Sequence, residues 1–340
     1  MVDRVSSLPD EVLCHILSFL PTEDVFVTNL VSKRWRPLWL SVPTLDLDEI
    51  RCSRRDIRLV GSHSSFMEFV DASILRRGIH QPIKTLRLQC RWRCPVFKVN
   101  EWLKAAADRK VENLQFYCSA NWQYLPCTIF SITTLVVLKL RRVDFRGFSS
   151  VELPSLKSLH LDDLRFSKTK HLIELLNSFP NLETLEAKDI WFHFDDPSFK
   201  GKGKLKPLSK LVRADLSLNM TKKLVIYNID EFVLEFGDAD IPIFPNLIHF
   251  ELILEGIVKM EAVLYLLNHC PQLQTFVLVV KSSNMVWPNT PVVPECFSSQ
   301  LQTCTIYEGA ECEITFEEQF GPEPSLKNMG EADVISEITN

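Results

Sequence analysis

Ten cysteines and eight histidines are the residues of this chain most suited to chemistry, because both types bind metal ions and act as nucleophiles. The closest cysteine pair is Cys90 and Cys94, and no second Cys/Cys or Cys/His pair stands at the spacing of a zinc site. The histidines are scattered, with His160 and His249 in or beside predicted strands. We therefore expect no metal site, and we interpret the cysteines as reduced, mostly buried thiols without disulfide partners.

Other patterns typical of enzymes are equally weak. Gly201-Lys202-Gly203-Lys204 lacks the spacing and the Ser/Thr of a phosphate-binding loop. Asp195-Asp196 before Pro197 is typical of a turn. The sequence contains neither a Gly-x-Ser-x-Gly nor a His-Glu-x-x-His motif. We therefore expect a chain that is not an enzyme and that needs no cofactor.

The composition indicates a folded protein rich in leucine. Of 340 residues, 46% are hydrophobic and 24% are charged, while 46 are leucine and only 10 are glycine. The longest apolar runs are five or six residues, far short of the roughly 20 that a membrane helix needs. The opening residues do not form a secretory signal peptide. We expect a protein of the cytoplasm and/or the nucleus, with no membrane partner.

The net charge of −5 is unevenly distributed. Residues 311–340 hold eight acidic side chains and one basic side chain, Lys327, so that the remainder of the chain is close to neutral. A near-neutral body offers no electrostatic basis for binding nucleic acid. The acidic segment carries Gly and Pro and is predicted to be disordered.

The first 48 residues predict three short helices, separated by residues that typically start or end a helix. Ser7-Leu8-Pro9-Asp10 is typical of a helix start, Pro21 ends the first helix, and Pro37 limits the third. Such a small unit cannot bury all of its apolar residues by itself. Its leucines, isoleucine and two tryptophans therefore predict a protein interface.

The segment from Leu8 to Trp39 closely resembles the F-box, in Leu8-Pro9, in Glu11-Val12-Leu13 and in Val31-Ser32-Lys33-Arg34-Trp35. In that family the helices dock on the Skp adaptor of a Skp–cullin–F-box ubiquitin ligase, which links them to the cullin and RING subunits. The resemblance assigns seven residues to the adaptor surface: Leu8, Pro9, Leu13, Ile16, Leu17, Val31 and Trp35. A different interpretation is a helical cap whose apolar stripe faces inward.

From residue 83 onward a relaxed L-x-x-L-x-L template recurs ten times at intervals of 18 to 29 residues, which is typical of leucine-rich repeats. The last two apolar positions alternate along a short strand and point inward. The templates begin at Ile83, Val111, Leu135, Leu156, Leu182, Leu211, Ile229, Leu247, Leu273 and Leu301. Each repeat leaves apolar area that only its neighbours can cover, so the pattern predicts a solenoid.

Two further features of the sequence refine the predicted solenoid. Leucine-rich repeats often place Asn or Cys three residues beyond the last apolar position of the strand. In three of the repeats this position holds Val143, Leu164 or Ile190, and a phenylalanine follows two residues later. We expect apolar turns and an irregular solenoid that resembles the repeats of plant F-box proteins. The segment from Phe244 to Glu308 resembles the FBD domain that closes many of those proteins, although the chain departs from that pattern after Glu313.

The expected fold is α/β, with a three-helix F-box followed by an irregular leucine-rich-repeat solenoid, parallel strands on the concave face and helices or loops on the convex face. We divide the chain into an F-box (1–48), a linker with a lead-in helix (49–82), leucine-rich repeats (83–240), an FBD domain that continues them (241–310) and the acidic tail (311–340).

The residue between the two inward positions of each strand points outward and could contact a target protein. Seven of these outward residues are charged or polar candidates for target binding: Arg87, Gln115, Lys139, His160, Glu186, Asp215 and Glu251. They change from basic or neutral to acidic along the chain, which suits a partner with the opposite order of charge. A row of ordinary solvated polar residues, with no role in binding, would give the same pattern.

The resemblance implies a substrate-recognition subunit that brings an unidentified target protein to ubiquitination and proteasomal degradation. Two alternatives stay open. One is an F-box receptor that senses a small molecule or an inositol phosphate through a basic cluster: Arg76, Arg77, Arg87, Arg91, Trp92 and Arg93. The other is an interaction scaffold that does not act in a ligase.

Overall fold

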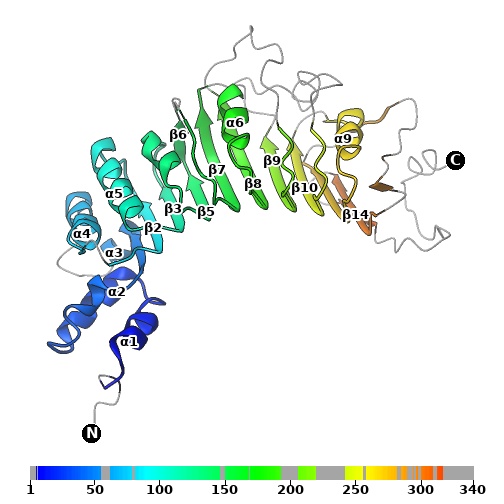
Figure 1. Cartoon of the computed structure of the whole chain (residues 1–340). Coiled ribbons are helices and arrows are strands. Elements are labelled where there is room, and N and C mark those ends of the chain that lie inside the picture. Colours follow the sequence, from blue (N-terminus) through cyan, green and yellow to red (C-terminus); the bar gives the residue numbers. More distant parts are fainter. Residues whose placement is uncertain are drawn as a thin grey trace. The chain divides into compact units, whose positions relative to one another are not determined.

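The computed structural model describes residues 5, 7–54, 62–78, 81–145, 150–167, 169–192, 206–219, 242–255, 258–281, 285–288, 294, 296–297, 300–308 and 312–316. The chain divides into two compact units, Met1–Leu156 and Lys157–Asn340. Both are built from parallel strands with helices between them (Figure 1).

The first unit opens with short helices. These are α1 (Asp10–Leu17), α2 (Thr22–Val27) and the 3₁₀ turns η1 (Thr28–Leu30) and η2 (Leu38–Leu40). Pro9 precedes α1 and Pro21 precedes α2, and each helix carries two acidic residues in its first turn, where the helix dipole favours negative charge. The first two of the three predicted helices are confirmed; the third is replaced by turns before Pro37, and η2 begins only after that proline.

The sheet of the first unit contains β1 (Thr44–Asp48), β2 (Thr85–Cys90), β3 (Asn113–Cys118) and β5 (Val137–Arg141), paired in parallel in this order. In addition, β4 (Gln123–Tyr124) and β6 (Val143–Phe145) form a short parallel pair. Connecting segments contribute α3 (Glu49–Arg54), α4 (His63–Leu75), α5 (Val96–Asp108) and η3 (Cys127–Ser131). The predicted lead-in helix before Gly78 corresponds to α4.

The division at residues 48 and 83 needs a correction. Thr44–Asp48 forms β1, the edge strand that pairs with β2 through Leu45 to Leu86 and Leu47 to Leu88. The sheet therefore begins within the stretch assigned to the F-box, and residues 49–82 connect two of its strands. The alternating Thr-Leu-Asp-Leu-Asp sequence has the period-two pattern of a half-buried strand and could have revealed β1. Its two leucines are fully buried.

The second unit continues the same pattern with β7 (Ser158–Phe166), β8 (Thr184–Phe192), β9 (Arg213–Asn219), β10 (His249–Glu255), β12 (Thr275–Val280) and β14 (Thr303–Glu308). They pair in parallel in this order, and β15 (Cys312–Phe316) adds to β14 in the antiparallel sense. A separate pair joins β11 (Val258–Lys259) to β13 (Met285–Val286).

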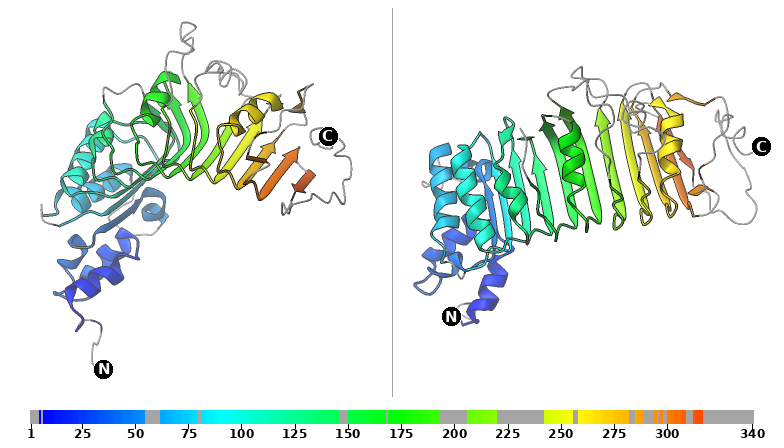
Figure 2. Two further views of the ribbon diagram at one scale, coloured as in Figure 1. Left: turned by 45° about the vertical axis from the view of Figure 1, so that its right-hand side comes forward. Right: turned by 45° about the horizontal axis from the view of Figure 1, so that its top comes forward.

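Helices α6 (Thr169–Leu176) and α9 (Met260–Leu267) lie on one face of the strands in this unit, and α4 and α5 do so in the first (Figure 2). Among the described residues, no helix combines the length and the apolarity that crossing a bilayer would require.

Stacked inward residues hold the strands together. In the first unit Leu86, Leu114 and Leu138 align across three strands, and all are buried. Phe250 and Phe276 align in the same way in the second unit, with ring centroids 5.8 Å apart. Because complete burial of a leucine or phenylalanine side chain stabilises by about 1.5–3 kcal/mol, these ladders account for the stacking of repeats.

The apolar turns are also confirmed. Val143, Leu164 and Ile190 are buried, as are Phe145 and Phe166. The residue that precedes each of the first three, namely Arg142, Asp163 or Asp189, has a positive φ of 54°, 54° or 51°. The strand thus bends at one left-handed residue and then returns an apolar side chain to the core, so the turn is held by apolar packing.

Of two further sequence predictions, one falls outside the described residues and the other is partly wrong. The template at Ile229-Phe232-Leu234 lies outside the described residues, and β9 pairs directly with β10. The disorder predicted for 311–340 is wrong at Cys312–Phe316, because this segment pairs with β14 as β15. Residues 317–340 lie outside the described residues.

Candidate functional site

The helical start of the chain has its own apolar core. Leu13 and Leu17 of α1 pack with Val25 of α2 and with Trp35, Leu38 and Val42. Leu8, Cys14 and Trp39 pack against this cluster and are partly buried. Arg34 ties the start of α1 to the later turn, through hydrogen bonds to the Leu8 carbonyl and, at 2.8 Å, to Asp10. The module is therefore a folded unit with a filled interior.

This core corrects part of the predicted adaptor surface. Leu13, Leu17 and Trp35 are buried with exposed fractions of 0%, 2% and 8%, so these side chains build the module and offer little surface to a partner. Leu8 is half-buried against the core. Pro9, Ile16 and Val31 are exposed, so that only these three of the seven fully fit a contact role. Adaptor contact itself stays a prediction.

A second set of apolar residues faces solvent, and we name it the exposed F-box surface. Phe19, Leu30 and Val31 have exposed fractions of 76%, 80% and 64%. The full set is Val5, Val12, Ile16, Phe19, Leu20, Val27, Leu30 and Val31. Sequence reasoning did not assign Phe19 or Leu30 to the partner surface, although apolar residues outside the i, i+3, i+4 stripe of the core were the available signal.

Polar contacts join this module to the first strand of the sheet. The Thr22 hydroxyl accepts a hydrogen bond of 2.7 Å from the Asp46 N–H, and the Glu23 carboxylate pairs with the Arg51 guanidinium. Arg51 also pairs with Asp46 at 3.1 Å. Glu23 is only 2% exposed, so this ion pair is desolvated on the Glu23 side. Residues of α2, β1 and α3 are thereby held together.

Arg77 makes a second connection. Its guanidinium donates hydrogen bonds to the carbonyls of Val42 at 2.6 Å, Ser73 at 2.7 Å and Trp39 at 3.1 Å. The side chain is buried, and burial together with nearby Arg109 lowers the pKa of Arg77 to about 10. Arg77 therefore has a structural role and does not reach the predicted basic cluster.

Three further arginines of the basic cluster make separate contacts. After β2, Arg91 lies over the Trp92 ring at 5.4 Å and Arg93 over the Tyr124 ring at 5.5 Å. Arg87 lies 3.9 Å from Asp46 across the strand pair. This arrangement does not support the small-molecule or inositol-phosphate interpretation, which needs the basic side chains to converge on one pocket.

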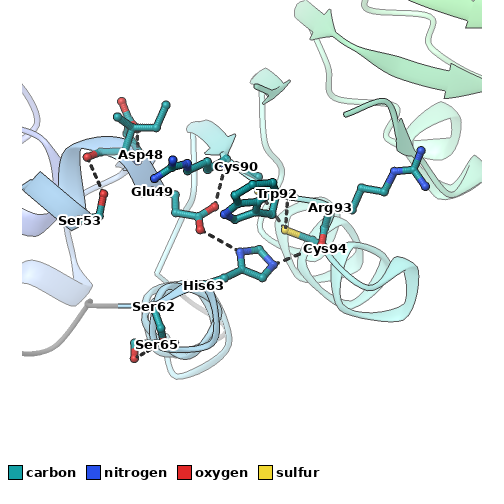
Figure 3. Close-up of polar contacts among 12 residues, drawn as sticks. Asp48, Glu49, Ser53, Ser62, His63, Ser65, Cys90, Trp92, Arg93 and Cys94 are labelled. Carbon is teal, nitrogen blue, oxygen red and sulfur yellow. Dashed lines mark hydrogen bonds and ion pairs between the residues drawn. The ribbon is translucent and has the colours of Figure 1, made fainter. Parts of the chain in front are cut away.

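A buried carboxylate fixes the loop that carries these arginines (Figure 3). Glu49 accepts a hydrogen bond of 2.6 Å from the Arg91 N–H and lies 3.0 Å from His63 Nδ1. The other ring nitrogen of His63 lies 3.2 Å from the Arg93 carbonyl. Both ring nitrogens of His63 thus lie within hydrogen-bond distance of oxygen atoms, one of the carboxylate and one of the backbone. The network orders the loop and leaves Trp92 about half exposed.

The predicted outward residues stand side by side by strand register. In the first unit Arg87 aligns with Gln115, and Gln115 with Lys139. In the second unit His160, Glu186, Asp215 and Glu251 align in that order. Arg87 is exposed, Asp215 is buried, and the other five are half-buried. The structure therefore groups each part of the set on one sheet face, within each unit separately.

Charge pairs already form on these faces. His160 Nδ1 lies 2.7 Å from Glu186, and Arg213 Nε donates to Asp215 at 2.8 Å. Asp46 precedes Arg87 in the first unit, and this acidic residue was missed because β1 was not recognised. The predicted change from basic to acidic residues therefore begins with an acid.

Three possible metal ligands meet in the second unit. One ligand atom each from Asp215, His249 and Glu251 lies within 4.8 Å of the other two. Asp215 comes from β9, and the other two residues come from β10. Burial, reinforced by Arg213, lowers the pKa of His249. Sequence spacing missed the group because its members become neighbours only through strand pairing.

An open groove in the second unit crosses the loops that lead into β8, β9, β10 and β12. Its lining is mixed, with the polar side chains of Glu183, Lys210, Asn246, Gln272 and Gln274 beside the apolar ones of Val212, Pro245 and Ile248. One lysine and several amides suit a peptide backbone better than a highly charged phosphate ligand.

Comparison with known proteins agrees with this architecture. The family model of the F-box domain matches residues 5–46. A second model, described as "FBD-associated F-box protein At5g56370, LRR repeats", matches residues 99–196. Both matches fall on segments whose structure fits their names, helices in the first case and stacked strands in the second.

Curated relatives come from Arabidopsis thaliana. F-box/LRR-repeat protein At3g59190 is 32% identical over 270 residues, covering 76% of this chain and 68% of the relative. F-box/FBD/LRR-repeat protein At5g56420 is 29% identical, covering 91% of this chain and 86% of the relative. F-box/LRR-repeat protein At4g14096 is 36% identical over 196 residues, and this chain spans less than half of its length, 42%. The chain belongs to the plant F-box/FBD/leucine-rich-repeat family.

Proposed function

We propose that this chain is the substrate-recognition subunit of a Skp–cullin–F-box ubiquitin ligase, and that it has no catalytic step of its own. The F-box would bind a Skp-type adaptor, and through the adaptor the cullin and RING subunits. The repeats would bind a target protein for ubiquitination and proteasomal degradation. The rate gain would come from proximity between the target and the ubiquitin-loaded conjugating enzyme.

The exposed F-box surface is the observation that carries this proposal. Its residues stay in solvent although the module already has a complete core, so their exposure is not the result of incomplete folding. Clustered exposed apolar residues on a small module are typical of a protein interface. The F-box resemblance identifies the partner of this interface as a Skp-type adaptor.

The junction with the first strand supports the proposal in a second way. Thr22 and Glu23 contact residues of β1 and α3, and Arg77 contacts two carbonyls of the F-box segment. A subunit that positions a target needs a firm connection between its adaptor module and its recognition surface. The ion pair and the buried guanidinium supply such a connection between the F-box and the first repeat.

The test is co-purification of the full chain with a plant Skp-type adaptor after co-expression. Leu30→Asp should abolish the complex, because it places a charge on the most exposed of these apolar side chains, which the adaptor would have to desolvate. Phe97→Asp is the matched control, since Phe97 is also exposed, at 62%, but lies on α5 outside the F-box. It should leave the complex intact.

Two outcomes would contradict the proposal. A folded wild-type chain that forms no complex with any Skp-type adaptor would favour the scaffold interpretation. A complex that tolerates Leu30→Asp but is lost with Phe97→Asp would place the interface elsewhere. Addition of cullin, RING and conjugating subunits to the intact complex then tests whether a captured target is ubiquitinated.

A further inference from the structure

The three possible ligands on β9 and β10 occupy one small region of the open sheet face. Glu251 is the register partner of Asp215, and His249 lies two residues before Glu251 on the same side of its strand. One carboxylate oxygen from each acid and one imidazole nitrogen lie within 4.8 Å of one another. Two rigid neighbouring strands thus bring together three ligand types that divalent transition metals accept.

Two atoms of this group face one another without a hydrogen bond. Asp215 Oδ1 and His249 Nε2 are both buried; they lie at ion-pair distance from each other but without good hydrogen-bond geometry, and neither makes a hydrogen bond with another described residue. Asp215 is only 7% exposed. A buried carboxylate oxygen without a hydrogen bond costs more than about 1 kcal/mol, and a cation bound between this oxygen and the imidazole nitrogen would remove that cost.

The distance between these atoms fits a shared metal ion. His249 Nε2 and Asp215 Oδ1 are 3.4 Å apart. Two ligands at about 2.0–2.1 Å from a tetrahedral zinc ion are separated by roughly 3.3 Å. The pair is therefore already spaced as two corners of a tetrahedron, and the longer, half-buried Glu251 side chain can supply a third.

The surroundings of the group support this arrangement. Arg213 Nε donates a hydrogen bond of 2.8 Å to Asp215 Oδ2, which orients the carboxylate and leaves Oδ1 directed at His249. Outer contacts of this kind commonly fix ligating carboxylates. With Asp215 and Glu251 ionised, the Arg213 charge leaves one net negative charge to attract a cation.

We propose that Asp215, His249 and Glu251 form a binding site for a divalent transition metal, Zn²⁺ in the first place, on the open face of the second unit. This inference departs from the expectation of no metal site and is independent of the proposed ligase role. Three protein ligands leave a fourth position of the metal open for water or for an acidic group of a bound partner.

The test is calorimetric titration of the purified full chain with Zn²⁺, paired with Co²⁺ absorption spectra. Wild type should bind one equivalent with nitrogen and oxygen ligands, without the intense charge-transfer band that cobalt–thiolate bonds give. Asp215→Asn, His249→Gln and Glu251→Gln should each weaken binding by roughly tenfold or more, because each removes a ligand. The half-buried Glu251 makes its variant the least demanding for folding.

His160→Gln is the matched control. His160 and Glu186 form a similar histidine–carboxylate pair at 2.7 Å on the same face, outside the group of three. This variant should bind Zn²⁺ as wild type does. Zinc should also raise the thermal midpoint of wild type and of His160→Gln, but not of His249→Gln.

The proposal is overturned if wild type shows no saturable Zn²⁺ binding, in which case His249 and Asp215 form an ordinary histidine–carboxylate contact. It is also overturned if the three variants bind as tightly as wild type, or if the cobalt spectrum shows thiolate ligation, since the metal would then occupy cysteines.

Discussion

At the scale of single residues, the chain uses ordinary amino acids where glycine is the common solution. Lys110 ends α5 with φ 58°, and the N–H groups of Lys110 and Val111 donate to the carbonyls of Ala107 and Ala106. This is the Schellman pattern, in which the left-handed residue is usually glycine. A lysine there pays the steric cost of a Cβ in left-handed backbone.

Lys110→Gly should therefore stabilise the chain by about 0.5–1 kcal/mol, because glycine adopts this backbone without that cost. Urea unfolding measures the change. Lys110→Ala is the control, since it removes the same exposed side chain but keeps the Cβ, and it should give no gain. Equal stabilisation by both variants would mean that the lysine side chain, not the backbone, is responsible.

The cysteines differ in burial and in the pKa of their thiols. Burial raises the pKa of Cys52 and of Cys270 to about 12, while Cys127 is exposed. Because the thiolate is the reactive form, and because a raised pKa keeps it protonated below about pH 12, Cys52 and Cys270 should resist alkylation in the folded chain at pH 8. Cys127 should react first.

Mass spectrometry after brief iodoacetamide treatment reads out each site. Addition of denaturant is the internal control, since it should make all the cysteines reactive at similar rates. Rapid labelling of Cys270 in the native chain would show that the core around α9 opens far more easily than its packing suggests.

At the scale of elements, the sequence pattern predicts the positions of the strands better than it predicts which apolar side chains are exposed. The period-two alternation that ends in Leu86 and Leu88 recurs in every described strand of the repeat ladder, because inward positions must be apolar for repeats to stack. The same reasoning missed β1, whose two leucines fall in a segment already assigned to helices.

The F-box surface was harder to predict for a physical reason. A small helical module needs apolar residues both for its own core and for its partner, and one sequence pattern serves both. Leu13 and Ile16 lie three positions apart on α1, yet Leu13 is buried and Ile16 is exposed. The metal-ligand group was beyond sequence reasoning altogether, because Asp215 and His249 meet only through strand register.

The junction between the F-box and the first repeat leads to a prediction at this scale. Glu23→Gln should destabilise the first unit by about 1–3 kcal/mol, because it removes the charge of a buried acceptor of the Arg51 guanidinium, while Arg51 keeps its pair with Asp46. Asp10→Asn is the matched control: it breaks the Arg34–Asp10 pair, which is well exposed on both sides. Its effect should stay below about 1 kcal/mol.

Chemical denaturation followed by tryptophan fluorescence measures both variants, since Trp35 and Trp39 lie in or beside the F-box core. Equal, small effects of the two substitutions would show that the Glu23 pair is screened by water and contributes little to the connection.

At the scale of the whole molecule, the structure changes how the F-box should be inactivated. Removal of residues 1–48 would delete β1 together with the helices, and it would expose the edge and the leucines of β2. Leu30→Asp is the better choice, because Leu30 is 80% exposed and the core stays complete. A loss of function in that variant then reports on the interface and not on folding.

Target capture with this variant tests the open sheet face. Under proteasome inhibition, affinity capture should recover the same target protein from wild type and from Leu30→Asp. The double charge reversal Arg87→Glu with Lys139→Glu should lose it, because both residues lie in the outward row of the first unit, on β2 and β5 on either side of β3. A loss of at least roughly tenfold is expected for two reversed contacts, since like charges at an interface cost several kcal/mol.

The control is a second double reversal, Lys84→Glu with Lys104→Glu, which changes the net charge equally at two exposed positions outside the outward row. It should retain the target. If both double variants lose the target to the same extent, then overall charge guides the encounter and the outward row has no special role. If neither does, the target binds elsewhere, and the groove lined by Glu183, Lys210 and Gln274 becomes the next surface to mutate.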